Sequence, residues 1–271
     1  WLKLVCLLLL NPKHFRSCKA CGLMGNITGR AVKSADLPVE LNLQDAPGHS
    51  HVALDVGNAT SINKRWGLRL VCVSDTHGNH RTMDVPEGDV LIHAGDFTLF
   101  GRREHALDFD AWLAELPHKT KIVILGNHEN NADWNKQVAE LLPHATVLRQ
   151  SDFQLSEDGP RFFGTDFFWP IKKGTNNPYF EQIPEGTDVI LAHGPALGCA
   201  DGGQGCEALL AAVRRVRPAL VVSGHIHRAR GASELLHEGG QAGKTVLLNA
   251  ANCGSGKEER RIVHSPIVVD I

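Results

Sequence analysis

Polar residues able to bind metal ions follow short apolar runs at five places in this 271-residue sequence. They are Asp75, His77, Asp96, Asn127, His128, His193, His225 and His227. Histidine is frequent, with fifteen residues against one Tyr and two Met, and imidazole is the commonest metal ligand among side chains. Carboxylate, amide and imidazole groups together suit Mn²⁺, Fe or Zn²⁺ better than Ca²⁺. Because no cysteine belongs to the set, we do not expect a closed structural zinc site.

The number of these groups indicates how many ions they hold. A single ion with an open catalytic position uses about three protein ligands, whereas two ions that share a carboxylate use about seven. The seven candidate ligands are Asp75, His77, Asp96, Asn127, His193, His225 and His227. Asp96 stands alone after its apolar run, so it is the natural bridging carboxylate. The sequence therefore predicts two divalent metal ions.

Each motif also has an ordinary structural interpretation. Asp75-Thr76-His77 alone fits a helix cap beside a surface histidine, and Gly95-Asp96 alone is a turn signal. The segment Gly224-His225-Ile226-His227 is more specific, because its two imidazoles face one side of an extended chain. The joint occurrence of all five motifs, each closing an apolar run, favours the metal site.

The apolar runs before these motifs are typical of buried strands, and they cover residues 68–73, 89–93, 121–125, 188–192 and 219–223. Helical periodicity predicts helices over residues 104–116, 132–142 and 205–216. Later apolar runs predict further strands at 161–163, 245–248 and 267–271. Alternating strands and helices indicate an α/β fold, in which the carboxyl ends of the strands carry the site.

The order of the motifs resembles that of the calcineurin-like metallophosphoesterase superfamily, over residues 67–271. The matching motifs are Asp75-x-His77, Gly95-Asp96, Gly126-Asn127-His128-Glu129, His193-Gly194 and Gly224-His225-x-His227. The resemblance implies a two-sheet β-sandwich flanked by helices. Finer features resemble the branch called metallophosphoesterase-domain-containing proteins; they are Ser74-Asp75-Thr76-His77, Ala94-Gly95-Asp96-Phe97-Thr98 and His193-Gly194-Pro195-x-Leu197-Gly198.

The same resemblance implies a role for each residue. The ligands divide into two triads and a bridge: Asp75, His77 and His227; Asn127, His193 and His225; and Asp96. His128 lies beside the phosphate as general acid or transition-state stabiliser. A hydroxide that bridges the metals attacks phosphorus, because a bound divalent ion can lower the pKa of water from 15.7 to about 7.

We expect a phosphodiesterase that acts on a small phosphate ester, and the branch resemblance suggests cyclic nucleotides. The alternatives are a phosphomonoesterase or protein phosphatase on the same site, or a non-catalytic metal-binding scaffold, which the complete ligand set disfavours. A nucleic-acid partner is not expected, because 28 Lys and Arg balance 30 Asp and Glu. The physiological substrate, the metal identity and the oligomeric state stay open.

Residues 1–62 lack a sustained apolar period, so we expect a poorly ordered extension before a catalytic domain at 63–271. The apolar run Trp1–Leu10 is too short for a membrane span, which takes about twenty residues. Seven irregularly spaced cysteines suit free thiols, and Cys18-x-x-Cys21 has no second ligand pair nearby for a zinc knuckle. We expect a cytoplasmic protein; a truncated signal segment at Trp1–Leu10 is the alternative.

Four weaker features complete the predictions. Arg102-Arg103 and Arg214-Arg215-x-Arg217 fit solvated helix faces better than phosphate clamps. Phe167-Phe168-Trp169 lies in a loop and is a candidate for stacking a nucleobase. Asn249-Ala250-Ala251-Asn252-Cys253 follows a predicted strand, and we expect it to be a plain loop.

Overall fold

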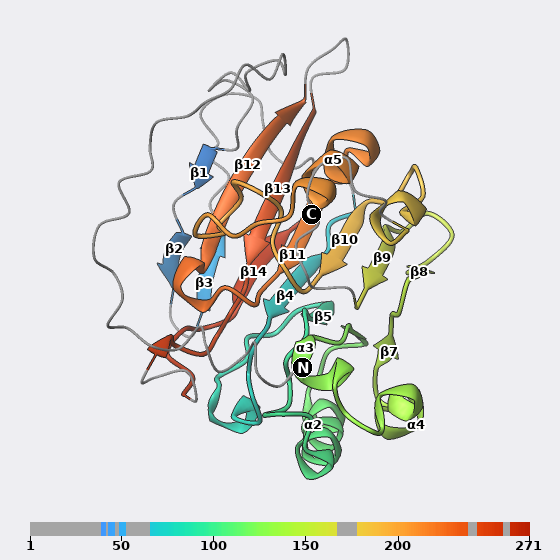
Figure 1. Ribbon diagram of the computed structural model, residues 1–271, viewed down its shortest axis with the longest axis vertical. Helices are drawn as coiled ribbons and strands as arrows, with labels where there is room; N and C mark the ends of the chain where they lie inside the picture. The colour runs from blue at the N-terminus through green and yellow to red at the C-terminus, as the bar shows by residue number, and fades with distance from the viewer. Residues whose placement is uncertain are drawn as a thin grey trace, which may run out of the picture. The chain divides into compact units, whose positions relative to one another are not determined.

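The computed structural model describes residues 39–41, 43–46, 49–52, 66–166, 178–237, 243–256 and 261–271. All of them lie in the larger of two units into which the chain divides, Ala35–Ile271. Within these residues the strands form two sheets of seven strands each (Figure 1). The first sheet runs, in spatial order, β1 (Val39–Leu41), β12 (Gly231–His237), β13 (Gly243–Asn249), β11 (Leu220–Ser223), β10 (Val189–Ala192), β9 (Arg161–Thr165) and β8 (Ser151–Gln154).

Both sheets contain parallel and antiparallel strand pairs. In spatial order the second sheet runs β2 (Leu43–Ala46), β3 (His49–Val52), β14 (Ile267–Asp270), β4 (Arg69–Val73), β5 (Val90–His93), β6 (Thr120–Val123) and β7 (Thr146–Val147). Strands β4, β5 and β6 are parallel to one another, as are β9, β10, β11 and β13 in the first sheet. The carboxyl ends of the parallel strands therefore meet at one edge of each sheet, which is where the predicted site residues follow.

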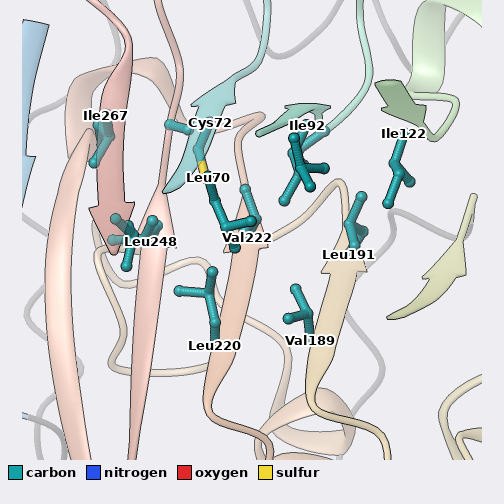
Figure 2. Close-up of a cluster of buried hydrophobic side chains, with 14 of the residues drawn as sticks. Leu70, Cys72, Ile92, Ile122, Val189, Leu191, Leu220, Val222, Leu248 and Ile267 are labelled. Carbon is teal, nitrogen blue, oxygen red and sulfur yellow. The ribbon is translucent and has the colours of Figure 1, made fainter. Parts of the chain in front are cut away.

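Apolar side chains fill the space between the two sheets (Figure 2). Leu70 and Cys72 of β4 belong to this core, whereas Val71 and Val73 of the same strand belong to a second cluster on the other face. Side chains alternate between the faces of a strand, so a strand covered on both faces is apolar throughout. This double burial explains the continuous apolar runs that the sequence shows before each motif.

Helices cover the outer faces of both sheets. Helix α2 (Arg103–Glu115) buries Phe109 and Leu113 in the cluster that contains Val71. Helix α5 (Glu207–Val216) buries Leu209 and Val213 in a third cluster with strands β10 and β11. The predicted fold class, an α/β protein with two sheets flanked by helices, is confirmed.

The helix predicted over residues 132–142 is wrong in extent. Only η3 (Asn135–Gln137) and α4 (Val138–Leu141) form there. Trp134 is 2% exposed, and its indole N–H donates to the carbonyl of Gly101 at 2.7 Å. This buried anchor holds residues 131–134 in a turn, so the helical pattern begins after it.

Part of the predicted N-terminal extension is regular structure. β1 pairs with β12, and the β2–β3 hairpin joins the second sheet because β3 pairs with β14. Strands of three or four residues are too short to show a period, so the sequence pattern missed them. The boundary predicted at residue 62 and the cytoplasmic location stay predictions. Cys18, Cys21 and the Phe167–Trp169 cluster lie outside the described residues.

Two further findings concern the cysteines and membrane insertion. The cysteines of the described part, Cys72, Cys199, Cys206 and Cys253, are buried. Among the same residues, no helix has the length and apolar character needed to cross a membrane.

Candidate metal centre

Loops at the carboxyl ends of five strands carry the eight predicted site residues. Those after β4, β5 and β6 carry Asp75, His77, Asp96, Asn127 and His128; those after β10 and β11 carry His193, His225 and His227. The structure brings all eight into one buried or half-buried cluster, which we call the metal cluster. Asn127 opens the short helix α3 (Asn127–Asn130). Each sheet contributes to the cluster, so it lies between them.

One half of the metal cluster consists of Asp75, His77 and His227. The Nε2 atom of His227 lies 3.2 Å from Oδ1 of Asp75 and 3.2 Å from Nε2 of His77. One ligand atom from each of the three residues lies within 4.8 Å of the others. This is the triad that the family resemblance predicts for one metal ion.

The other half gathers around His193. Its Nε2 atom lies 3.4 Å from Oδ2 of Asp96 and 3.3 Å from Oδ1 of Asn127. His225 completes a group with Asp96 and His193 whose ligand atoms lie within 4.8 Å of one another. His193 Nε2 is also 3.9 Å from Oδ1 of Asp75, so the two halves are in contact.

Three histidines of the cluster turn their Nε2 atoms inward. The Nδ1 atoms of His77, His193 and His227 face backbone carbonyls of Thr98, Ala94 and Gly254, at 3.3, 2.7 and 2.7 Å. A carbonyl oxygen only accepts, so each Nδ1 carries a proton, and each Nε2 can offer a lone pair to a metal ion that displaces any proton held there. Imidazoles oriented in this way are typical of metal ligands. The donor set and its orientation therefore fit divalent metal ions.

Charges inside the cluster are strongly coupled. Burial opposes the charged form of His193, but the carboxylates of Asp96 and Asp75 outweigh it and raise the pKa of His193 to about 10. Burial likewise opposes charge on His227, yet its hydrogen bond with Asp75 raises its pKa to about 9. Burial and the charge of His193 lower the pKa of His225 to about 4. In the absence of metal, protons on His193 and His227 thus balance the two buried carboxylates.

His128 has the opposite tautomer. The backbone N–H of Phe100 points at Nδ1 of His128 at 2.8 Å, and the carbonyl of Thr98 lies at 3.1 Å from the same atom. An amide can only donate, and its contact is the shorter, so Nδ1 accepts and the proton is on Nε2. That Nε2 lies 3.8 Å from Oδ2 of Asp96. His128 therefore offers a donor at the edge of the cluster rather than a lone pair.

The backbone at the strand ends is shaped for these contacts. Asp75, His77, Asp96 and His225 have φ values of 54°, 46°, 55° and 67°, a region that non-glycine residues seldom adopt. Such conformations concentrate at functional sites, where the surrounding contacts hold them.

The role of Glu129 could not be predicted from its position in the Gly126-Asn127-His128-Glu129 motif. Its fully buried carboxylate accepts from the N–H groups of Asp96, Thr98 and Gly126, at 2.9, 2.8 and 2.9 Å, and from the hydroxyl of Thr98 at 2.6 Å. Glu129 thus joins the loop of Asp96 to the loop of Asn127. A carboxyl residue in a buried helical turn beside a ligand is the signal that could have identified it.

The segment Asn249–Cys253 is not a plain loop, so that prediction is wrong. The side-chain oxygen of Asn252 accepts from the N–H of Ser74 at 2.9 Å, directly before Asp75. Asn249 Nδ2 donates to the carbonyl of Ile226 at 2.9 Å, between His225 and His227. Both asparagines are fully buried. The segment therefore supports two ligand loops that belong to different sheets.

Two arginines of the candidate phosphate clamps, Arg215 and Arg102, have surroundings that differ from the metal cluster. Arg215 donates to backbone carbonyls of Phe180, Glu181 and Ile183, at 3.2, 3.4 and 3.0 Å, around η4 (Phe180–Gln182). Arg102 precedes α2 and is exposed.

Comparison with known proteins agrees with this geometry. Residues 68–229 match the family described as calcineurin-like phosphoesterase. The chain belongs to this family, so it is a metal-dependent phosphoester hydrolase with a centre of two divalent ions. Its sequence is 35% identical to metallophosphoesterase domain-containing protein 1 of Homo sapiens over 240 residues, covering 75% of this chain and 71% of that protein. It is 34% identical to UPF0046 protein K07C11.7 of Caenorhabditis elegans over 217 residues, covering 70% and 72%.

The family and the metal centre predicted from the motifs are thereby confirmed. The assignment of individual residues to each metal ion, and of His128 to the phosphate, stays a prediction that the contacts above support.

Proposed function

We propose that this protein hydrolyses phosphodiester bonds, and that its substrates are nucleotides, cyclic nucleotides included. The observation that supports this proposal is the Nε2–H of His128 at the edge of a cluster in which the other oriented imidazoles turn Nδ1 to a backbone carbonyl. One donor beside the metal charge matches the single negative charge of a diester better than the double charge of a monoester.

The residues of the metal cluster would have different roles. Asp75, His77 and His227 would hold one ion, Asn127, His193 and His225 the other, with Asp96 shared. Two divalent ions at this place supply an acidified water and neutralise phosphoryl oxygens. The Nε2–H of His128 faces the same space and donates a hydrogen bond to the departing oxygen, whose developing negative charge it stabilises. A donor aimed in this way typically contributes about 10²–10³-fold to the rate.

Hydrolysis of bis(p-nitrophenyl) phosphate by metal-stripped protein with Mn²⁺ restored tests this proposal. We expect turnover that depends on Mn²⁺ and exceeds that of p-nitrophenyl phosphate, the monoester. Asp96→Asn is expected to lose both bound metal and turnover, because it weakens a carboxylate that contacts His193 and His128. Asp84→Asn, at an exposed aspartate, is the matched control and should keep both.

Two outcomes would overturn the proposal. Faster hydrolysis of the monoester would favour a phosphomonoesterase on the same site. Full metal occupancy without hydrolysis of either ester would favour a metal-binding scaffold.

A further inference from the structure

A pocket opens at the edge of the first sheet where the loops after β10 and β11 lie. It has a volume of about 660 Å³, and the residues around it include Gly198, Asp201, Gly202, Arg228, Arg230 and Ser233. We call it the Arg228 pocket. Ligand pockets in proteins usually measure about 300–1,000 Å³, so it can hold a group of nucleotide size.

The Arg228 pocket is connected to the metal cluster through the segment that follows His227. Arg228 directly follows His227 within η5 (His227–Ala229). Asn249 Nδ2 donates both to the carbonyl of Ile226, in the segment between the two histidines, and to the carbonyl of Ala200, in the pocket's glycine-rich loop, at 2.9 and 3.0 Å. The pocket therefore adjoins the segment that carries His227.

Positive charge is available inside this pocket. Arg228 is exposed, and in the described part of the chain its guanidinium makes a 3.4 Å hydrogen bond to the carbonyl of Gly202. Arg230 adds a second guanidinium, which donates to the carbonyl of Ser265 at 2.8 Å. Among the described residues that line the pocket, Asp201 carries the acidic side chain.

The carboxylate of Asp201 is already engaged by its own loop. It accepts from the N–H groups of Gly198, Gly203 and Gly205 at 2.9, 3.0 and 2.9 Å. Asp201 is 7% exposed, so it shapes the loop and leaves Arg228 for a ligand. With two arginines and one carboxylate, the described side chains of the lining have a net positive charge.

We infer that the Arg228 pocket binds the part of the substrate that lies beyond the reacting phosphate, and that this part carries a second phosphate group. The inference rests on the proposed function, because it needs one phosphate at the metal cluster. Guanidinium groups bind phosphate through paired N–H donors, which suits Arg228 to this role. A nucleotide that carries a further phosphate besides its phosphodiester has the required chemistry, and a nucleoside bisphosphate is the simplest probe of the two phosphate positions.

Calorimetric binding to the full chain, stripped of metal and reloaded with Mn²⁺, tests the inference. The probes are adenosine 3′,5′-bisphosphate and adenosine 5′-monophosphate. We expect the bisphosphate to bind at least about tenfold more tightly than the monophosphate, and Arg228→Ala to abolish this preference. Arg214→Ala removes an exposed arginine on α5 and should keep both the preference and the turnover of the wild type.

The outcomes separate this inference from the proposed function. Equal binding of the two probes by the wild type, or an unchanged preference in Arg228→Ala, would overturn the pocket assignment whatever the esterase activity. A preference that depends on Arg228, in protein that does not hydrolyse bis(p-nitrophenyl) phosphate, would support the pocket and overturn the esterase proposal.

Discussion

His128 differs from His77, His193 and His227 in the backbone group that faces its Nδ1 atom. Carbonyls face Nδ1 in His77, His193 and His227, whereas the amide of Phe100 faces Nδ1 in His128. A backbone group of the opposite polarity therefore decides whether an imidazole presents a lone pair or a proton. This difference gives His128 a separate role within one cluster.

Substitution His128→Ala is expected to keep both metal ions and to reduce the turnover of bis(p-nitrophenyl) phosphate by about 10²–10³-fold. The metal content should remain because the lone pairs of the candidate ligands are untouched. Metal analysis together with steady-state kinetics checks both parts. Undiminished turnover in the metal-replete variant would remove His128 from the mechanism, and loss of metal would make it a ligand.

Glu129→Gln is predicted to weaken metal binding although Glu129 touches no metal position. An amide places an N–H₂ group among four donors, and each unsatisfied buried group costs about 1–3 kcal/mol. The loops of Asp96 and Asn127 would then loosen, and loss of such supporting contacts lowers metal affinity about 10–100-fold. Titration with Mn²⁺ measures the affinity, and Glu140→Gln, at an exposed position of α4, is the control. Equal affinities of the two variants would contradict the prediction.

The elements place the ligands through glycines at the strand ends. A Cβ atom at Gly224 would lie 2.1 Å from Oδ2 of Asp75 and 2.1 Å from Oγ of Ser74. The N–H of the next residue, His225, donates to that same Oδ2 at 2.9 Å. Only glycine lets β11 end so close to the loop after β4.

Gly224→Ala is therefore expected to displace Asp75 and to remove metal from its half of the cluster while the sheets persist. Circular dichroism reports the sheets, and metal analysis reports the loss. Gly231→Ala is the control, because its Cβ would meet nothing closer than 3.8 Å. A Gly224→Ala protein with full metal content would contradict the prediction, because the loop would then have shifted without displacing Asp75.

The elements also show which parts of the structure the sequence could predict. Strands β4, β5, β6, β10 and β11 were predictable because burial on both faces makes them apolar throughout and because a polar motif follows each. The hairpin β2–β3 and β1 were not, since strands this short gain their stability from pairing with β12 and β14. The supporting role of Asn252 was hidden for a related reason. Its partner Ser74 is 178 positions away, and only the folded chain brings them together.

At the scale of the whole molecule, the metal cluster joins the two sheets. The first sheet supplies His193, His225 and His227, and the second supplies the two carboxylates and His77. A metal ion held by both groups therefore connects sheets that otherwise meet mainly through their apolar core.

Stability of the metal-stripped protein is predicted to fall as the pH rises from about 6.5 to about 10. The pKa values of His193 and His227, about 10 and about 9, are raised above their ordinary value of 6.5. Groups with a raised folded-state pKa contribute stability that is complete below the unfolded pKa and lost as the pH passes the folded one. Urea unfolding at pH 6.5, 8 and 9.5 measures this loss.

Protein loaded with Mn²⁺ should behave differently over the same range. Metal replaces the protons on His193 and His227, so its binding releases protons and becomes more favourable as the pH rises. The difference in unfolding free energy between loaded and stripped protein should therefore grow with pH. A constant difference would contradict the assignment of these histidines as ligands.

The position of β14 in the second sheet has a consequence for synthesis on the ribosome. β14 lies between β3 and β4, and Asp270 pairs with Arg69, which precedes it by 201 positions. Asn252, which supports the loop of Asp75, is also made late. Asp75, His77 and Asp96 thus leave the ribosome long before the strands and side chains that hold them in place. During translation the early part of the chain is expected to expose apolar strand edges, which makes it a substrate for chaperones until residues 249–270 have emerged.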